Sequence, residues 1–470
     1  MTARRYWSLL ALLAGAGCIA AAVWAAIPPG GLSVSFTPSA AQPRDGLLWL
    51  RTRSGQIVDS EGRVVLLRGF NDDALLDYPW RRPPPLDETD ATLIRGAGFD
   101  LVRLPISWSR IEPRRGEIDS AYLGEIATTV RLLERHGLYA VLDMHFLPGW
   151  GEAFDAPSAP AWAQIPGLPN VDWAHVDPFG KDTNPAEMAA EVHFWTAPDW
   201  QADFELAWRA VAERLKDESG LAGYDIYNEP HPFPIPPRLF EQWYMWPLYQ
   251  RSIAAIAQVD PNHLFFVEST LFGDTATAMV PLRAPDLVYS PHLYTDALVP
   301  AILSPGPNPI RHSIQERQRE AALLPAALWF GELGIQHSAA NAATWADEAL
   351  DQLDAAGSGW AWWQWRQDGG WGIRSESGGS LDLVFLRHLA RPYLAAAPRG
   401  VAAAEGLGTL RVTVAADHAP APIVLAWPGL TAPPPAVVST CGAVAAYDAA
   451  SATLTISAPA GACRLTVRPA

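Results

Sequence analysis

Short apolar segments alternate with amphipathic segments between residues 46 and 396 of the chain. The apolar segments are rich in β-branched and aromatic residues and predict eight strands, at 64–71, 99–105, 138–144, 224–228, 263–268, 287–292, 327–334 and 359–365. Between them, apolar residues recur at helical spacing and predict helices, among them 121–136, 204–216, 238–259 and 344–355. Strands that alternate with helices are typical of a parallel sheet covered by helices.

This repeat predicts an α/β fold of a particular kind, a (β/α)8 barrel with insertions that occupies residues 46–396. An open, doubly wound sheet is the alternative for the same alternation. However, no glycine-rich phosphate-binding loop follows the first predicted strand, so the barrel is favoured.

The end of the chain has a different pattern. Residues 400–470 contain short alternating runs, such as 410–414, 423–427 and 454–456, separated by Pro, Gly and Asp. They predict a small C-terminal antiparallel β-sandwich. Cys441 and Cys463 both lie in this segment, and in an exported chain we expect them to form a disulfide.

The N-terminus predicts export. Arg4 and Arg5 precede an apolar run over 7–27, so residues 1–27 are expected to be a signal peptide or an uncleaved membrane anchor. The Pro-, Ser- and Ala-rich residues 28–45 are expected to be a linker. The protein would then be secreted, periplasmic or anchored to the cell membrane.

Charge excludes one class of partner. The chain carries 34 Lys and Arg against 50 Asp and Glu, a formal net charge of -16. With no basic excess to neutralise phosphates, nucleic acid is disfavoured as a partner. The 21 Trp residues suit stacking on sugar rings, but tryptophan also fills large cores.

Polar residues at the C-terminal ends of the predicted strands form a candidate active site, because that end of a barrel carries the catalytic groups. The residues are Arg103, Asp143, His145, Asn228, Glu229, His292, Tyr294, Glu332 and either Trp363 or Trp365. Glu229 and Glu332 are the pair that glycoside hydrolysis requires: one protonates the leaving oxygen, and the other attacks the sugar or activates water. Acid/base and covalent catalysis need no metal and no organic cofactor, so we expect neither.

The ordered motifs resemble those of family 5 glycoside hydrolases. They are Leu67-Arg68-Gly69-Phe70-Asn71, Val102-Arg103-Leu104-Pro105, Asn228-Glu229-Pro230 and Gly331-Glu332-Leu333-Gly334. Within the family the chain is most similar to endoglycoceramidases and related glycolipid β-glycosidases. That similarity is carried by Asp143-Met144-His145, Ala159-Pro160-Ala161-Trp162, Ser290-Pro291-His292-Leu293-Tyr294 and Arg391-Pro392-Tyr393.

The resemblance implies a role for each strand-end residue. Glu229 would be the general acid/base, Glu332 the nucleophile, and Asn228 the group that binds the sugar 2-hydroxyl. Tyr294 would lie near Glu332, and Arg103 would keep that carboxylate ionised. Asp143, His145 and a strand-eight tryptophan, expected to be Trp365, would bind the sugar in the −1 subsite. Structural roles stay open for three residues: an ion pair for Arg103, and buried histidines for His145 and His292.

The expected substrate is a glycolipid, although the sequence departs from the subgroup. Phe146-Leu147 follow Asp-Met-His where endoglycoceramidases usually have Gln-Asp, which leaves the preferred sugar and aglycone open. Segments 146–200 and 231–246 are rich in Pro, Trp and Phe. They either form an apolar wall for a lipid aglycone or simply pack onto the barrel.

Three functions follow. The first is hydrolysis of the bond between a glycan and a lipid aglycone by a retaining enzyme, with oligosaccharide or glucose released from ceramide. It would involve association with a membrane surface, and we expect a monomer. The second is an endo-β-glucanase of the cellulase type, and the third is a catalytically inactive carbohydrate-binding protein. The presence of both glutamates argues against the third.

Overall fold

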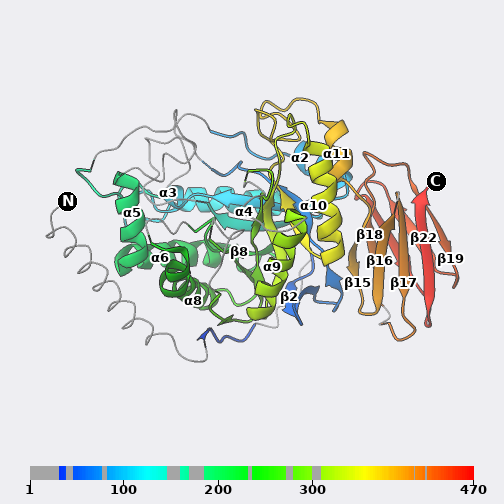
Figure 1. The fold of residues 1–470 in the computed structure, drawn as a ribbon, viewed down its shortest axis with the longest axis horizontal. Helices are drawn as coiled ribbons and strands as arrows, with labels where there is room; N and C mark the ends of the chain where they lie inside the picture. The colour runs from blue at the N-terminus through cyan, green and yellow to red at the C-terminus, as the bar shows by residue number, and fades with distance from the viewer. Residues whose placement is uncertain are drawn as a thin grey trace, which may run out of the picture.

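The structure is a computed structural model that describes residues 31–38, 46–76, 82–145, 159–168, 185–230, 235–270, 279–298, 308–406, 408–418 and 421–470. It has two parts, a barrel surrounded by helices and a smaller β-domain that contains the C-terminus (Figure 1).

The eight predicted strands form a closed parallel barrel. Its members are β5 (Arg68–Asn71), β6 (Leu101–Ile106), β7 (Tyr139–Met144), β8 (Leu221–Asp225), β9 (Leu264–Val267), β11 (Leu287–Tyr289) continued by β12 (His292–Leu293), β13 (Ala327–Leu333) and β14 (Gly359–Trp362). β14 pairs with β5, and β11 pairs with both β9 and β13, which closes the sheet. Some neighbours approach so closely that only glycine fits: a Cβ on Gly69 would lie 1.7 Å from the carbonyl oxygen of Leu101.

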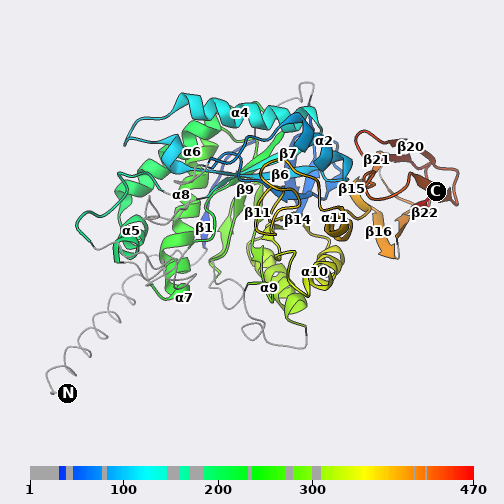
Figure 2. The ribbon, with the colours of Figure 1, turned by 90° about the horizontal axis from the view of Figure 1, so that it is seen from above.

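The predicted helices cover the barrel. The described helices are α2 (Glu88–Gly96), α3 (Trp108–Ile111), α4 (Ser120–Arg135), α5 (Pro185–Thr196), α6 (Pro198–Leu215), α7 (Pro237–Phe240), the π-helical turn η2 (Glu241–Met245), α8 (Trp246–Ala257), α9 (Pro309–Leu323), α10 (Ala342–Ala356) and α11 (Leu383–Leu389). Figure 2 shows α4, α6, α8, α9 and α10 around the central strands. Side-chain caps start several of them; Asp119, for example, accepts the N–H of Ala121 at 2.8 Å at the start of α4.

Two apolar layers hold the barrel together. Residues that point inward, including Leu101, Val141, Phe266 and Trp329, form a core inside the strands. Alternate residues point outward and pack under the helices. A hairpin of β2 (Leu50–Arg53) and β3 (Gln56–Asp59) adds Leu50 and Ile57 to the inner core.

The same hairpin belongs to the sheet that forms half of the C-terminal sandwich. From β3 the chain passes through β4 (Val64–Val65), which pairs with β15 (Tyr393–Ala397). The sheet order is β2-β3-β4-β15-β18-β21-β20, with β18 (Ile423–Ala426), β20 (Val444–Asp448) and β21 (Thr453–Ser457). The first predicted strand, 64–71, is therefore divided between two sheets, because β4 bonds to the sandwich and β5 to the barrel.

The predicted antiparallel sandwich is confirmed. Its second sheet has the order β16-β17-β22-β19, formed by β16 (Val401–Gly406), β17 (Thr409–Val414), β22 (Cys463–Pro469) and β19 (Pro435–Ser439). Leu425, Trp427, Val412 and Leu465 meet in the core between the sheets. The predicted disulfide between Cys441 and Cys463 is also present.

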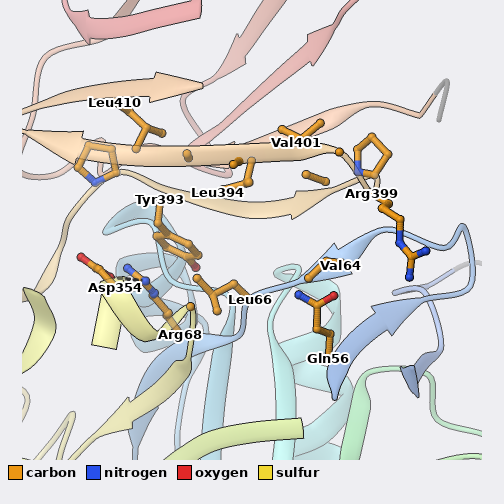
Figure 3. A pocket seen from close by; sticks show the side chains of 17 residues that line it. Gln56, Val64, Leu66, Arg68, Asp354, Tyr393, Leu394, Arg399, Val401 and Leu410 are labelled. Carbon is orange, nitrogen blue, oxygen red and sulfur yellow. Dashed lines mark hydrogen bonds and ion pairs between the residues drawn. The ribbon is translucent and has the colours of Figure 1, made fainter. Parts of the chain in front are cut away.

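A hollow of about 470 Å³ lies where the sandwich meets the barrel (Figure 3). Beside it, the guanidinium of Arg68 pairs with Asp354 from α10 and lies over the Tyr393 ring, 4.5 Å from its centroid. These contacts link the first barrel strand to the first strand of the sandwich.

Part of the segment expected to be a linker is bound to the barrel. Residues Leu32–Ser33 form β1, which pairs with β10 (Leu282–Arg283), and the ring of Phe36 contacts Phe265. The apolar run at 7–27 lies outside the described residues. Among the described helices, none combines the length and the hydropathy that a membrane span requires.

The continuous sheet predicts that the barrel depends on the sandwich. Removal of residues 393–470 would take β15 from β4 and expose the hairpin that closes the inner core. We expect the melting temperature to fall by at least about 5 °C, since each kcal/mol lost lowers Tm by about 2–4 °C in a domain of 150–250 residues. Thermal unfolding checks this. A Cys441→Ala/Cys463→Ala chain, which keeps the sheet, is the control, and an unchanged Tm in the truncated chain would contradict the dependence.

Candidate active site

The fully buried guanidinium of Arg103 on β6 occupies the centre of the site and contacts four carboxyl groups. Its Nη1 donates to Glu332 at 2.7 Å, and its Nε donates to Asp225 at 3.0 Å. Its Nη2 lies 2.9 Å from Glu268 and 3.1 Å from Asp143. Burial alone would lower the pKa of Arg103, but the surrounding carboxylates raise it, so the group is a permanent cation.

Two asparagines complete the contacts of Arg103. Asn71 accepts from Nη1 at 3.0 Å and Asn228 accepts from Nη2 at 3.1 Å. The Nδ2 group of Asn71 in turn donates to the carbonyl of Gly331 at 3.1 Å. Side chains from strands that are distant in sequence are therefore fixed to one planar cation.

Glu229 and Glu332 face one another across the end of the barrel. One carboxylate oxygen of each, together with a ring nitrogen of His292, lie within 4.8 Å of one another. His292 Nδ1 is 2.9 Å from Glu229 and 3.5 Å from Glu332. The Tyr294 hydroxyl donates to Glu332 at 2.9 Å. The glutamates differ in exposure: the Glu229 side chain is 26% exposed and that of Glu332 is 6% exposed.

Strand ends explain how these groups meet. Glu332 is on β13 and pairs in register with His292 on β12. Glu229 follows β8 and has a φ of 45°, a left-handed conformation that is unusual for a residue with a side chain. Non-glycine residues held in this region cluster at functional sites.

Asp143, His145 and Trp363 form one wall of the site. Asp143 accepts from His145 Nδ1 at 2.8 Å. The His145 ring is stacked on Trp363, with 5.6 Å between centroids and 15° between planes. Burial alone would lower the pKa of His145, but Asp143 outweighs it and raises the pKa above its ordinary value.

The structure places Trp365 elsewhere, so the expected strand-eight residue is corrected to Trp363. Trp365 is fully buried, donates from Nε1 to Asp90 at 2.9 Å and packs against Phe70. Strand alternation would have carried an inward position from 361 to 365, but β14 ends at Trp362 and the alternation ends with it.

Glu268 and Asp225 also belong to the site, although neither is among the residues predicted from the sequence. Glu268 directly follows β9, so the strand-end rule that selected the other residues would also have found it. Asp225 is the last residue of β8, but the strand predicted at 224–228 placed it near the strand start, so the strand-end rule passed over it. Burial, the largest cause, raises the pKa of Glu268 to about 8 and that of Asp225 to about 6.

The carboxylates have the composition of metal ligands but surround a protein cation. Three groups of described residues bring His, Asp and Glu atoms together: Asp143, His145 and Glu332; Glu229, His292 and Glu332; and Asp143, Asp225 and Glu268. Arg103 contacts Asp143, Asp225, Glu268 and Glu332 among them, so a metal ion would meet its positive charge.

Part of the apolar wall expected beside the leaving group, residues 146–158, 169–184 and 231–234, lies outside the described residues. Of the described part, Trp246 and Met245 are fully buried in the core, so they are not available to a ligand. Trp243 and Tyr244 are half-buried.

A closed barrel with two opposed carboxyl groups at the ends of its strands is the architecture of a glycoside hydrolase. The chain matches the model of the cellulase family, glycosyl hydrolase family 5, over residues 58–369. Because this match covers more than half of the chain, the chain belongs to glycosyl hydrolase family 5 and is a glycosidase.

Its relatives include several endoglycoceramidases. Endoglycoceramidase I of Rhodococcus hoagii is 28% identical over 286 residues, which are 54% of this chain and 54% of that protein. The endoglycoceramidase of Hydra vulgaris is 22% identical over 262 residues, 48% of this chain and 50% of that protein. The chain thus spans about half the length of these curated relatives.

Solved structures give a fuller match. A crystal structure of endogalactoceramidase superposes with a TM-score of 0.75 at 27% identity and covers 90% of this chain and 100% of that chain. The ganglioside GM3 complex of endo-glycoceramidase II from Rhodococcus sp. superposes with a TM-score of 0.76 at 25% identity, over 89% of this chain and 100% of that chain.

The arrangement predicts that Arg103 is required for both stability and activity. In Arg103→Lys, an ammonium cannot make the separate contacts of the planar guanidinium, and buried carboxylates lose their partners. We expect the free energy of unfolding to fall by about 3–5 kcal/mol in urea denaturation, with a parallel loss of glycosidase activity. The matched control is Arg131→Lys, whose exposed ion pair with Glu218 should change stability by less than about 0.5 kcal/mol. Equal stability of the two variants would contradict a central role for Arg103.

Proposed function

We propose that the protein is a retaining β-glycosidase that acts by double displacement. The observation that carries this proposal is the approach of the two glutamates, whose nearest oxygens lie within 4.8 Å. Retaining enzymes have carboxyl groups about 5–5.5 Å apart, whereas inverting enzymes leave about 6.5–9.5 Å for a water molecule.

The surroundings of each glutamate support Glu332 as nucleophile. Arg103 and Tyr294 donate to its two oxygens at 2.7 and 2.9 Å, which fixes the carboxyl group and directs it toward the sugar. Glu229 is the more exposed of the two and lies where a leaving group has access to solvent. These differences divide the roles between the pair.

The reaction then proceeds in two balanced steps. Glu332 forms a bond to the anomeric carbon as the glycosidic C–O bond breaks, and Glu229 gives its proton to the departing oxygen. Water next attacks the same carbon, Glu229 takes the proton of that water, and the bond to Glu332 breaks. Both groups end in their starting protonation states.

The neighbouring residues suit a −1 subsite. Arg103 donates to Asn228 Oδ1, which orients the Nδ2 amide as the donor to the sugar 2-hydroxyl. His145, held by Asp143, offers a polar edge, and Trp363 offers an aromatic face for the sugar ring.

We further propose a ceramide glycoside as substrate. Support comes from the endoglycoceramidases among the relatives and from the solved structures of endogalactoceramidase and of endo-glycoceramidase II with ganglioside GM3. An enzyme of this kind would be exported, would work as a monomer and would meet its substrate at a membrane surface. The runner-up is β-glucan hydrolysis, which the family membership and the similarity to an endoglucanase of Acetivibrio thermocellus favour.

Product analysis decides between these substrates. Purified protein is incubated in detergent with a monohexosyl ceramide, a ganglioside and a soluble β-glucan. Intact oligosaccharide plus ceramide from the ganglioside is the expected result. Glucose from the monohexosyl lipid alone would indicate exo action, and cleavage of the glucan alone would overturn the lipid substrate while the two glutamates keep their roles.

The nucleophile is tested with Glu332→Ala. We expect activity on aryl β-glycosides to fall more than about a thousandfold with folding retained, because no covalent intermediate forms. Azide should restore part of the turnover and give the α-glycosyl azide, since it enters the cavity left by the carboxylate. Full residual activity, or a β-glycosyl azide from this variant, would remove Glu332 from the nucleophile role.

A further inference from the structure

Glu268 links the main chain of the acid/base to two other parts of the site. One oxygen, Oε2, accepts the backbone N–H of Glu229 at 2.8 Å. The other, Oε1, accepts from Arg103 Nη2 at 2.9 Å and lies 3.2 Å from His292 Nε2. The side chain is only 2% exposed, and these three partners come from β6, from β12 and from the segment that follows β8.

The contact with Glu229 falls where the backbone is least favourable. Glu229 has a left-handed φ of 45°, a conformation that persists in non-glycine residues only when the surrounding structure holds it. Its N–H points away from the strand ladder and toward Glu268 Oε2. The buried carboxylate of Glu268 accepts this N–H, so the loss of that hydrogen bond is unfavourable.

The second oxygen of Glu268, Oε1, is linked to the side chain of Glu229 through His292. Across the His292 ring, Nε2 faces Glu268 and Nδ1 faces Glu229 Oε1 at 2.9 Å. Glu268 therefore acts on Glu229 in two ways. It accepts the backbone N–H of Glu229 directly, and it contacts the His292 ring, which in turn contacts the Glu229 carboxyl group. Such an arrangement fixes both the base and the tip of the Glu229 side chain.

We propose that Glu268 is the positioning residue of the acid/base, holding the Glu229 main chain and the His292 ring so that the Glu229 carboxyl faces the leaving oxygen. This role rests on the proposed function, in which Glu229 protonates the leaving group. Glu268 itself touches no substrate atom in this scheme. Its substitution is therefore expected to affect most strongly the step that needs proton transfer.

Several charged or titratable groups face Glu268. Arg103 lies on β6, Asp143 on β7, Asp225 on β8, Glu229 beyond β8, His292 on β12, and the Tyr249 hydroxyl of α8 accepts the Glu268 N–H at 3.2 Å. Burial and then Asp225 raise the pKa of Glu268 to about 8, against the opposing effects of His292 and Arg103. This pKa in the folded protein exceeds that of a glutamate in the unfolded chain. Protonated Glu268 therefore stabilises the folded protein most at acidic pH, and this contribution to the free energy of unfolding is lost as pH rises toward 8.

The decisive experiment measures kcat/KM of Glu268→Gln on two β-glucosides with different leaving groups. The variant keeps the shape of the side chain, and its carbonyl can still accept one hydrogen bond, but its NH2 group meets the donors Arg103 and His292. For an alkyl β-glucoside, which needs proton assistance, we expect a loss of about 10–100-fold. For a dinitrophenyl β-glucoside, which does not, we expect a change of less than about threefold.

Glu229→Gln is measured in parallel to separate the two proposals. If Glu229→Gln shows the leaving-group difference and Glu268→Gln loses activity equally on both substrates, the positioning role is wrong and the acid assignment stands. If Glu229→Gln shows no such difference, the proposed function itself fails. These substrates test the glutamates whether or not ceramide is the natural aglycone.

A second variant keeps the proposal testable should Glu268→Gln fold poorly. Tyr249→Phe removes only the hydroxyl that accepts the Glu268 N–H, and we expect the same leaving-group difference at about threefold. A Tyr249→Phe effect that is equal on both substrates would overturn the role.

Discussion

The site depends on the buried cation of Arg103. A guanidinium at the centre of the barrel binds carboxyl groups that come from β7, β8 and β13 and from the end of β9, and it also bonds to Asn71 and Asn228. Its planar donors set the distances among these groups, because each donor has a fixed direction. Glu332, the proposed nucleophile, receives the shortest of these contacts.

Carboxyl groups outnumber cations in this site, and the excess has chemical consequences. Asp143, Asp225, Glu268 and Glu332 are buried around Arg103, and the more exposed Glu229 lies beside them with His145 and His292. Burial is the largest cause of the raised pKa values of Glu268 and Asp225, and neighbouring carboxyl groups add to it. For His145 and His292, the surrounding carboxylates outweigh burial and raise the pKa values toward the cationic form. A field of this kind lets one carboxyl group act as an acid while a neighbour acts as a nucleophile.

The rest of the architecture keeps this arrangement rigid. One sheet runs from the hairpin β2–β3, which adds Leu50 and Ile57 to the barrel interior, through β4 and β15 into the sandwich. At the seam, Arg68 on the first barrel strand pairs with Asp354 and stacks on Tyr393. The sandwich and the barrel therefore form one folding unit. The C-terminal strand β15 pairs with β4, and so extends the sheet that β2, β3 and β4 form near the N-terminus.

The sequence by itself determined the barrel, the sandwich, the disulfide, the strand-end positions of Glu229, Glu332, His145 and His292, and the place of Arg103 on the second barrel strand. These features follow from local periodicity and from the rule that parallel strands place their C-terminal ends together. Only the tertiary structure decided that Trp363, and not Trp365, lies beside His145, because the end of β14 interrupts the alternation. Only the tertiary structure brought Asp225 and Glu268 to Arg103 and joined 64–65 to the sandwich. Contacts of this kind join residues far apart in the chain, and no local pattern records which side chain will meet a given cation across a closed barrel.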